Sequence, residues 1–235
     1  MRPAQVTIWP KQLPELTPEQ VAIRDDYMRF FYSAVYTERF GWIQRFNHTY
    51  AARSFGPGLR TLDIGAGLGE HLEFEDGGAQ DYVAMELRPE MAAEIAQRYP
   101  HVTTVTGDVE RGLDYGPGEF DRVLAIHVLE HLRNLPAALE ELLRVMRPGA
   151  VLSVVLPCEG GLLYTLGRRL TTQRVFEKRY GMSFDWCIQS EHVSTVPEIA
   201  RELDTRFRRE HASWFPTMIP TVHSNICVGF TYRRT

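Results

Sequence analysis

Apolar and polar residues follow two alternating patterns along this chain. Short apolar runs rich in β-branched residues predict buried strands at 62–64, 82–85, 102–106, 120–126 and 151–156. Between these runs, apolar residues recur at helical spacing, as in the segment that starts at Pro89 and in residues 135–146. Strands that alternate with helices in this way predict an α/β fold, with a parallel sheet and ligands beyond the C-terminal ends of its strands.

Two helices are expected before the first of these strands. Thr17, Pro18 and Gln20 provide an N-cap, a first-turn proline and a capping-box partner for a helix that runs towards Thr37. Residues 40–54 form the second predicted helix. The aromatic side chains of this region can be interpreted as core residues that pack on the following domain. In a second interpretation, Tyr32, Tyr36 and Trp42 also cover the substrate.

The C-terminal third is less regular. Residues 158–192 form a long excursion after the fifth strand, and a helix is expected to open at 196–198. The segments 206–214 and 222–232 are then expected to form a closing pair of strands.

Composition places the chain among ordinary globular proteins. Its 235 residues are 44% hydrophobic and 24% charged, and the net charge of -4 provides no global attraction to nucleic acid. Cys158, Cys187 and Cys227 are widely spaced without a C-x-x-C pair, which favours a reducing cytoplasm. No apolar run is long enough to span a bilayer, so we expect a soluble, cytoplasmic protein.

A glycine-rich turn after the first strand is the strongest candidate for function. Gly65, Gly67 and Gly69 allow the backbone to press closely against a ligand. Asp63, just before the turn, is suited to hold a cationic ammonium group or the amides of the loop. A dinucleotide fingerprint would need its third glycine where Glu70 stands, which counts against a nicotinamide or flavin cofactor.

Two further carboxylates follow predicted strands. Glu86 ends the second strand some twenty residues after the turn, where it can accept both ribose hydroxyls of an adenosine. Asp108 follows the third strand and could accept the adenine amino group while Val109 packs on the ring. Their ordinary alternatives are a helix-capping or solvent-facing glutamate for Glu86 and a common Gly-Asp turn for Asp108.

Together these motifs resemble the class I S-adenosylmethionine-dependent methyltransferases. The run 63–69 is similar to their motif I, and 143–150 to their Leu-Arg-x-x-Arg-Pro-Gly-Gly region, with Ala150 in place of the second glycine. The resemblance implies a Rossmann-like doubly wound sheet of about seven strands, mostly parallel, with an antiparallel last strand and an N-terminal helical cap. It implies an arm and cap at 1–58 and the cofactor domain at 59–235, with an acceptor lid at about 158–192. The residues that it implies for cofactor binding are Asp63, Gly65, Ala66, Gly67, His71, Glu86, Leu87, Asp108, Val109 and His127.

Methyl transfer needs a base only if the acceptor atom carries a proton. His127, His131 and His192 are the candidates, because imidazole titrates near neutral pH and the first two follow the fourth strand. A backbone contact to the cofactor is an equal alternative for His127, and a structural hydrogen bond is the favoured one for His131.

The same histidines with Glu130 offer four possible ligands for a divalent ion. This set resembles the metal site of small-RNA 3'-end methyltransferases, although His127 replaces an acidic residue of that site. The sequence does not favour a metal, since the acidic net charge gives no support for RNA.

The lid segment is rich in basic residues, which predicts either a solvated helix face or an acceptor with a phosphate or carboxylate group. These residues are Arg168, Arg169, Arg174, Lys178 and Arg179. The chain is thus interpreted as a methyltransferase that acts on a small molecule. The reaction expected first is O-methylation of a sugar or natural-product precursor. The alternatives are a non-catalytic cofactor-binding scaffold or sensor and a NAD-dependent oxidoreductase.

Overall fold

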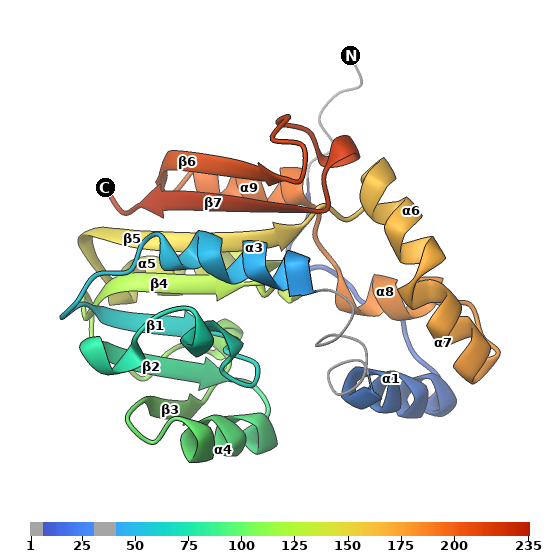
Figure 1. Cartoon of the computed structure of the whole chain (residues 1–235), viewed down its shortest axis with the longest axis horizontal. Helices are drawn as coiled ribbons and strands as arrows, with labels where there is room; N and C mark the ends of the chain where they lie inside the picture. Colours follow the sequence, from blue (N-terminus) through green and yellow to red (C-terminus); the bar gives the residue numbers. More distant parts are fainter. Residues whose placement is uncertain (1–6, 31–40) are drawn as a thin grey trace.

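The computed structural model describes residues 7–30 and 41–235 of the chain. These residues form a seven-stranded sheet in the order β3-β2-β1-β4-β5-β7-β6, in which β7 runs antiparallel to the strands on either side of it, β5 and β6, and the other pairs are parallel (Figure 1). The mostly parallel sheet and its antiparallel last strand are therefore confirmed. The strands are β1 (Arg60–Ile64), β2 (Asp81–Glu86), β3 (Thr103–Thr106), β4 (Phe120–Ile126), β5 (Met146–Pro157), β6 (Arg208–Phe215) and β7 (Cys227–Arg233).

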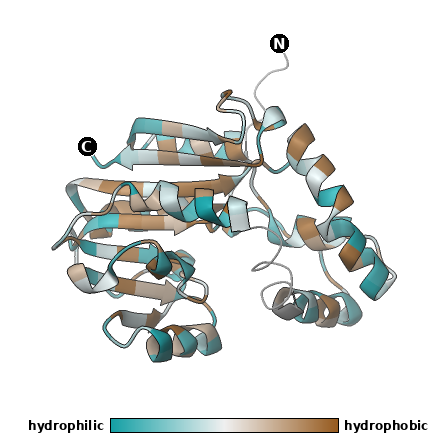
Figure 2. Ribbon diagram, in the orientation of Figure 1, coloured by the Kyte–Doolittle hydropathy of each residue, from teal (hydrophilic) through white to brown (hydrophobic). Residues whose placement is uncertain are grey.

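Helices cover both faces of this sheet. On one face α3 (Gly41–Ala52) and α4 (Pro89–Arg98) bury Ala51 and Ile95 against Leu124 of β4. On the other face α5 (Leu135–Val145) and α9 (Val196–Asp204) contribute Leu139 and Ile199 to the larger core. Figure 2 shows the corresponding apolar colour along the central strands. Burial of this apolar surface from two sides is the main stabilising contribution to the three-layer arrangement.

The strand β5 begins earlier than the sequence predicts. Residues 147–149, which follow the predicted helix, lie within the strand because Met146 already pairs with Phe120 of β4. A register shift between Phe120 and Arg122 accommodates the extra length. The helix α5 ends at Val145, one residue before its predicted end.

Only two 3-10 turns, η2 (Glu70–Glu73) and η3 (Gly77–Ala79), connect β1 to β2. The space beneath this short connection contains a buried ion pair, in which Arg122 of β4 donates to both carboxylate oxygens of Glu75 at 2.7 and 2.8 Å. Arg122 also donates to Ser54 Oγ and to the Ala51 carbonyl of α3. A polar network thus ties β4, the turn and α3 together.

A group of helices from the predicted lid segment, called the lid below, lies beyond the C-terminal ends of the parallel strands, on the right in Figure 1. It consists of α6 (Leu162–Leu170), α7 (Thr172–Tyr180) and α8 (Asp185–Glu191). The helix α1 (Pro18–Phe30) packs on this lid, since the Tyr27 ring lies 5.0 Å from the Phe176 ring and 5.5 Å from the Phe184 ring. The continuation of α1 towards Thr37, with Tyr32 and Tyr36, lies outside the described residues.

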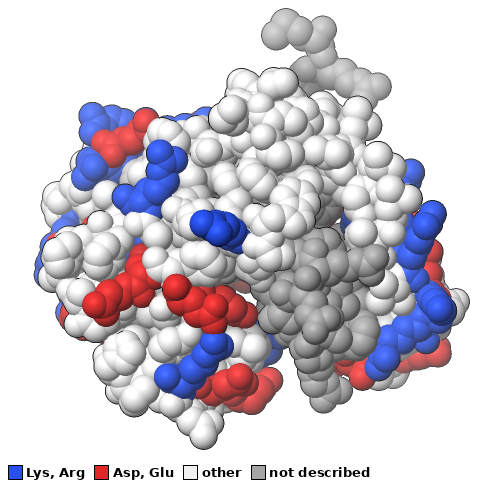
Figure 3. All heavy atoms as spheres, viewed as in Figure 1, with Lys and Arg blue, Asp and Glu red and all other residues white. Residues whose placement is uncertain are grey.

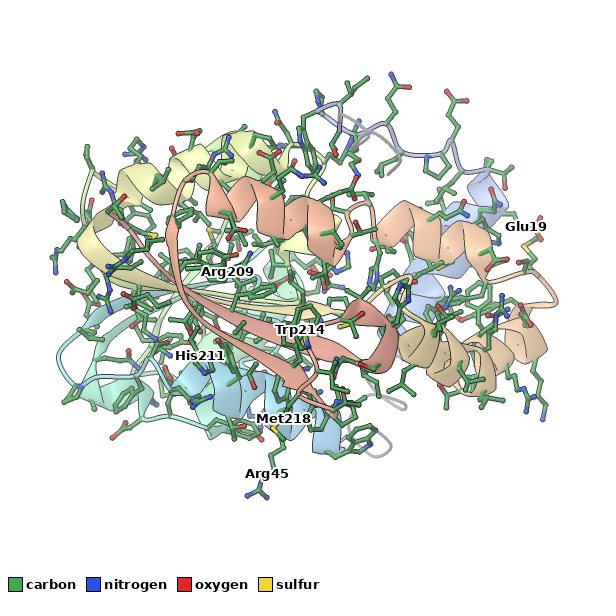
Figure 4. The ribbon with its side chains drawn as sticks, turned by 90° about the horizontal axis from the view of Figure 1, so that it is seen from above. Glu19, Arg45, Arg209, His211, Trp214 and Met218 are labelled. Carbon is green, nitrogen blue, oxygen red and sulfur yellow. The ribbon has the colours of Figure 1, made fainter. Side chains whose placement is uncertain are left out.

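The outer strand β6 contacts both helix layers. In Figure 4 its labelled residue His211 lies on the side of α3, whereas Arg209 lies on the side of α9. The hydroxyl of Tyr50 in α3 lies 3.3 Å from His211 Nδ1, and Arg209 donates to the hydroxyl of Tyr232 at 3.0 Å. Trp42 of α3 packs on the Phe215 ring at 5.4 Å and is half exposed.

The cysteines and the helices bear on two predictions from composition. Cys158, Cys187 and Cys227 are buried free thiols, and burial raises the pKa of Cys158 to about 12. Among the helices of the described residues, none has the length and apolar character needed to cross a membrane.

Candidate functional site

A cavity of about 630 Å³ opens at the C-terminal edge of the parallel strands. Its floor is formed by the ends of β1, β2 and β4 and by the loop after β3, and α1 contributes to its wall. The sheet order reverses between β1 and β4, and ligands of open α/β sheets bind at such a point. Seven residues predicted for the cofactor lie on this cavity: Gly65, Gly67, Glu86, Leu87, Asp108, Val109 and His127.

The glycine turn leaves no room for side chains on the cavity floor. Gly65 has φ +64°, and a Cβ at this position would lie 2.5 Å from the Cγ2 atom of Val128. Gly67 has φ +62°, which is also the left-handed region that favours glycine. The turn is anchored to the neighbouring strand because the Ala66 amide donates to the Met85 carbonyl at 3.0 Å.

Glu86 is a buried carboxylate that is already oriented at the cavity wall. Its Oε2 atom accepts from the Gly67 amide at 3.2 Å, and its Oε1 atom accepts from the Arg88 amide at 3.2 Å. Asp108 caps the 3-10 turn η4 (Val109–Arg111) by accepting from the Glu110 amide at 2.9 Å. Val109 is buried beside it. These positions bring together the polar and apolar groups that were predicted for an adenosine.

Three other predicted cofactor residues, Asp63, Ala66 and His71, lie around a smaller hollow of about 60 Å³ next to His48. Asp63 accepts from the Tyr82 hydroxyl at 2.8 Å, and burial is the main cause that raises its pKa to about 6. The loop amides bond elsewhere, since the Leu68 amide donates to Glu70 Oε2 at 2.9 Å. Asp63 was expected to hold either an ammonium group or the loop amides. The second of these roles is not observed, because the described residues show no hydrogen bond from a loop amide to Asp63.

His127 has an unusual backbone. Its φ is +55°, a region that residues other than glycine rarely occupy and that is concentrated at functional sites. The amide of His127 donates to the Val155 carbonyl at 2.9 Å, which holds this conformation at the end of β4. Its Nδ1 atom lies 3.3 Å from Glu130 Oε1. His127 therefore lies at both hollows, where its backbone and its ring face different neighbours.

A cluster of histidines and glutamates adjoins the cavity. Glu130 and His131 belong to the 3-10 turn η5 (Leu129–His131), and the His131 ring lies 4.9 Å from the His192 ring. His131 lines the cavity, and Glu130 is 1% exposed. His192 Nδ1 lies 3.2 Å from Glu159 Oε2. His127 and His131 thus line the cavity, and His192 lies beside His131 without being part of the cavity lining.

The basic residues of the lid are spread over its surface. Arg174, Lys178 and Arg179 lie on the exposed side of α7, where Figure 3 shows Lys and Arg side chains at the outer edge of the lid. Arg179 donates to Asp26 Oδ2 of α1 at 3.0 Å. Arg168 differs from them, because its side chain is 11% exposed.

Several cavity residues escaped the sequence analysis. Arg24, Asp25 and Met28 of α1 line the cavity, as does Glu191 at the end of α8. The four-residue spacing of Arg24 and Met28 places them on one helix face, but the sequence does not show which element that face meets. Glu159, which is not part of the cavity lining, follows the end of β5 by two residues and has no motif that marks its contact with His192.

A family profile described as "Methyltransferase domain" matches residues 62–154. This range holds the glycine turn, Glu86, Asp108 and the first two histidines. Residues 62–154 thus resemble the methyltransferase-domain family. A demethylmenaquinone methyltransferase of Beutenbergia cavernae is 38% identical to it over 99 residues, which are 42% of this chain and 40% of that protein. The chain thus matches less than half the length of this curated relative.

Solved structures extend the likeness of the methyltransferase fold beyond the matched segment. The 1,6-didemethyltoxoflavin-N1-methyltransferase of Burkholderia thailandensis has a TM-score of 0.60 at 20% identity and covers 100% of this chain and 98% of its own. The [4+2]-cyclase SpnF has a TM-score of 0.63 at 16% identity, with 95% and 99% covered. At these identities the likeness shows the fold, and the second of these proteins is named for a different reaction.

Proposed function

We propose that this chain transfers the methyl group of S-adenosylmethionine to an oxygen atom of a small molecule, such as a sugar or a natural-product precursor. The observation that carries the proposal is the single cavity that the glycine turn, Glu86, Asp108 and His131 share. This arrangement offers an adenosine site at one end and ionisable groups at the other.

The cofactor fits the first end by the chemistry of its wall. The carboxylate of Glu86 would accept the ribose hydroxyls, and Asp108 with the buried Val109 would hold the adenine. The open backbone at Gly65 and Gly67 would lie against the methionine part, next to Asp63 and His127. The ammonium and sulfonium groups of the cofactor are both positively charged. The carboxylates of Asp63 and Glu86 lie beside the turn and would provide the opposite charge.

The acceptor would enter between α1 and the histidine cluster. Methyl transfer from a sulfonium is a direct displacement, so the protein has to align the acceptor oxygen behind the methyl group and exclude water. Arg24 and Met28 of α1 would close this side of the cavity. The proton of the acceptor hydroxyl would be lost at the cluster of His131 and His192, which are within reach of Glu130 and Glu159.

An anionic acceptor is supported by Arg168 more than by the exposed lid residues. Its Nε and Nη1 atoms are buried and have no hydrogen-bond partner in the described part of the chain, and its nearest ion-pair distance is 3.9 Å, to Asp185. Burial opposes ionisation of nearby Glu159, but a hydrogen bond from His192 and the charges of His192 and Arg168 lower its pKa. Buried guanidinium groups normally hold an acid, and a phosphate or carboxylate of the acceptor would supply one.

Calorimetric titration with S-adenosylmethionine, S-adenosylhomocysteine and NAD tests the cofactor. We expect micromolar binding of the first two. Glu86→Ala removes charge-assisted hydrogen bonds to the ribose, so affinity should fall about 10-fold to 100-fold. Glu94→Ala, on an exposed turn of α4, is the matched control and should leave the affinity unchanged. Binding of NAD alone would overturn the proposal in favour of an oxidoreductase.

Radiolabelled methyl transfer to a panel of anionic and neutral sugars and phenols then separates an enzyme from a scaffold. Transfer to a hydroxyl supports the proposal. Tight cofactor binding without transfer to any acceptor of the panel would favour a sensor or scaffold, and transfer only to nitrogen would refute the choice of oxygen. The choice of oxygen rests on the cluster of ionisable groups. The similar structures do not favour oxygen, because one of them is an enzyme named for methylating a nitrogen of its own substrate.

A further inference from the structure

We infer that Glu130, His131 and His192 bind a divalent first-row transition-metal ion beside the acceptor end of the cavity. One potential ligand atom from each residue lies within 4.8 Å of those of the other two. Two imidazole nitrogens and one carboxylate oxygen form a set that suits zinc, cobalt or manganese and leaves other coordination positions open. The catalytic use of the ion rests on the proposed function, whereas its binding does not.

The hydrogen bonds of the two histidines leave the correct nitrogen atoms available. His131 Nδ1–H donates to the Glu191 carbonyl at 2.8 Å, so its Nε2 atom carries the free electron pair. Nδ1 of His192 lies 3.2 Å from the Glu159 carboxylate, to which it can donate in the same way. Metal-binding histidines typically donate their second ring N–H to a carboxylate or a backbone carbonyl. Both imidazoles are thus oriented as neutral ligands by partners outside the set.

Glu130 provides an independent observation. The residue is 1% exposed, and its Oε2 atom has no hydrogen-bond partner among residues 7–30 and 41–235. Its other oxygen lies 3.3 Å from His127 Nδ1 and 4.0 Å from His131 Nε2. A buried carboxylate oxygen without a partner costs free energy, and a cation held between Glu130 and the imidazoles would remove that cost.

The backbone holds the three ligands together although His192 is distant in sequence. The amides of Val193 and Ser194 both donate to the Glu130 carbonyl, at 2.8 and 3.2 Å. The segment that carries His192 is therefore fixed directly against the turn that carries Glu130 and His131. Such a connection forms the set before any ion arrives, which limits the entropic cost of binding.

This arrangement differs from the four-residue set that the sequence suggests. His127 is turned towards Glu130 Oε1 and lies outside the three-residue group, while Glu159 and the Glu191 carbonyl act as outer partners. An ion at this place would carry positive charge next to the acceptor hydroxyl. It would lower the pKa of a hydroxyl that binds to it, so that the hydroxyl would lose its proton to solvent water near neutral pH, with His131 and His192 acting as ligands rather than as proton acceptors.

Metal titration of the purified full chain, after treatment with a chelator, tests the inference. We expect one equivalent of Zn²⁺ or Co²⁺ to bind with micromolar or tighter affinity, and Co²⁺ to give visible absorption without a thiolate charge-transfer band. Glu130→Gln and His192→Ala should each weaken binding at least 100-fold. Glu159→Gln, which removes only an outer partner, should weaken it about 10-fold to 100-fold. His101→Ala, at an exposed position outside the cluster, is the control.

Two results would overturn the metal site. One is equal affinity of the wild type and Glu130→Gln in samples whose circular dichroism shows a folded protein. The other is a thiolate band, which would place the ion on the cysteines. Titration with S-adenosylmethionine in the same samples separates the two proposals. Cofactor binding without metal binding refutes the metal site alone, and metal binding without cofactor binding refutes the proposed function alone.

Discussion

Removal of the Glu75 charge should destabilise the protein strongly, although this residue lies outside the cavity. The carboxylate and its partner Arg122 are 1% and 0% exposed, and two hydrogen bonds join them. In Glu75→Gln the amide retains the shape of the side chain but leaves the guanidinium of Arg122 buried without an opposite charge. A buried charge that loses its partner is among the most destabilising changes in a folded protein.

Two arguments agree on the size of the effect. Burial raises the pKa of Glu75, but His71, whose Nε2 atom lies 2.9 Å from Glu75 Oε2, and the hydrogen-bonded Arg122 more than compensate and lower it from 4.5 to about 2. A depression of this size corresponds to about 3 kcal/mol of stability at neutral pH. Mutations that break buried ion pairs cost about 3–5 kcal/mol. Because the folded-state pKa is lowered, this stability is present above pH 4.5 and is lost as the pH falls towards about 2.

Urea denaturation at neutral pH measures the effect. Glu73→Gln is the control, since Glu73 and its partner Arg98 are half exposed and their pair should contribute less than about 1 kcal/mol. The double variant Glu75→Leu with Arg122→Met should recover much of the lost stability, because it removes both charges. A loss below about 1 kcal/mol in Glu75→Gln, or a loss no greater than in the control, would refute the reasoning.

Three further results are expected. Burial raises the pKa of Asp63 from 3.8 to about 6, so the contribution of Asp63 to stability falls as the pH rises through this range. In urea denaturation, Asp63→Asn should therefore gain about 1 kcal/mol of stability relative to the wild type between about pH 5 and about pH 8. A stability difference that stays constant with pH would contradict the raised pKa. Gly65→Ala should lower both the melting temperature and the cofactor affinity, because the new Cβ would lie 2.5 Å from Val128 and the φ of +64° disfavours alanine. An additional Val128→Ala should restore part of the loss. Full cofactor affinity in the single variant would exclude a close approach of the turn to the cofactor. Once an anionic acceptor is identified, Arg168→Gln should raise the KM for that acceptor about tenfold in steady-state assays. The control Arg174→Gln, at an exposed position, should change this KM less than twofold. Equal effects of the two variants would refute a specific role of Arg168.

Local patterns were sufficient to predict the order of the elements. The strand over 120–126 and the helix from Pro89 have the predicted starts, because apolar runs, spacing and a first-turn proline act over a few residues. The place of the residues predicted for the cofactor could be inferred for the same reason: each lies in the few residues that follow one strand. In a parallel sheet these residues meet at one edge, and the seven that line the cavity do so.

The extent of β5 could not be predicted locally. Residues 147–149 carry a proline and a glycine that normally end a helix, but the pairing of Met146 with Phe120 determines where the strand begins. Arg122 is a similar case. A charged residue in a strand suggests an exposed face, and only the chain that folds over it from the turn, with Glu75, makes complete burial possible.

The sequence by itself determined the α/β class, the glycine turn and the carboxylates that follow the strands, since hydrophobic spacing and backbone freedom are properties of neighbouring residues. Only the tertiary structure decided which side chains share a site. It joined α1 to the lid, and it placed His192 and Glu159 beside Glu130 and His131. The physical reason is that hydrogen bonds and burial between distant segments depend on packing, which leaves no signal in the spacing of residues along the chain.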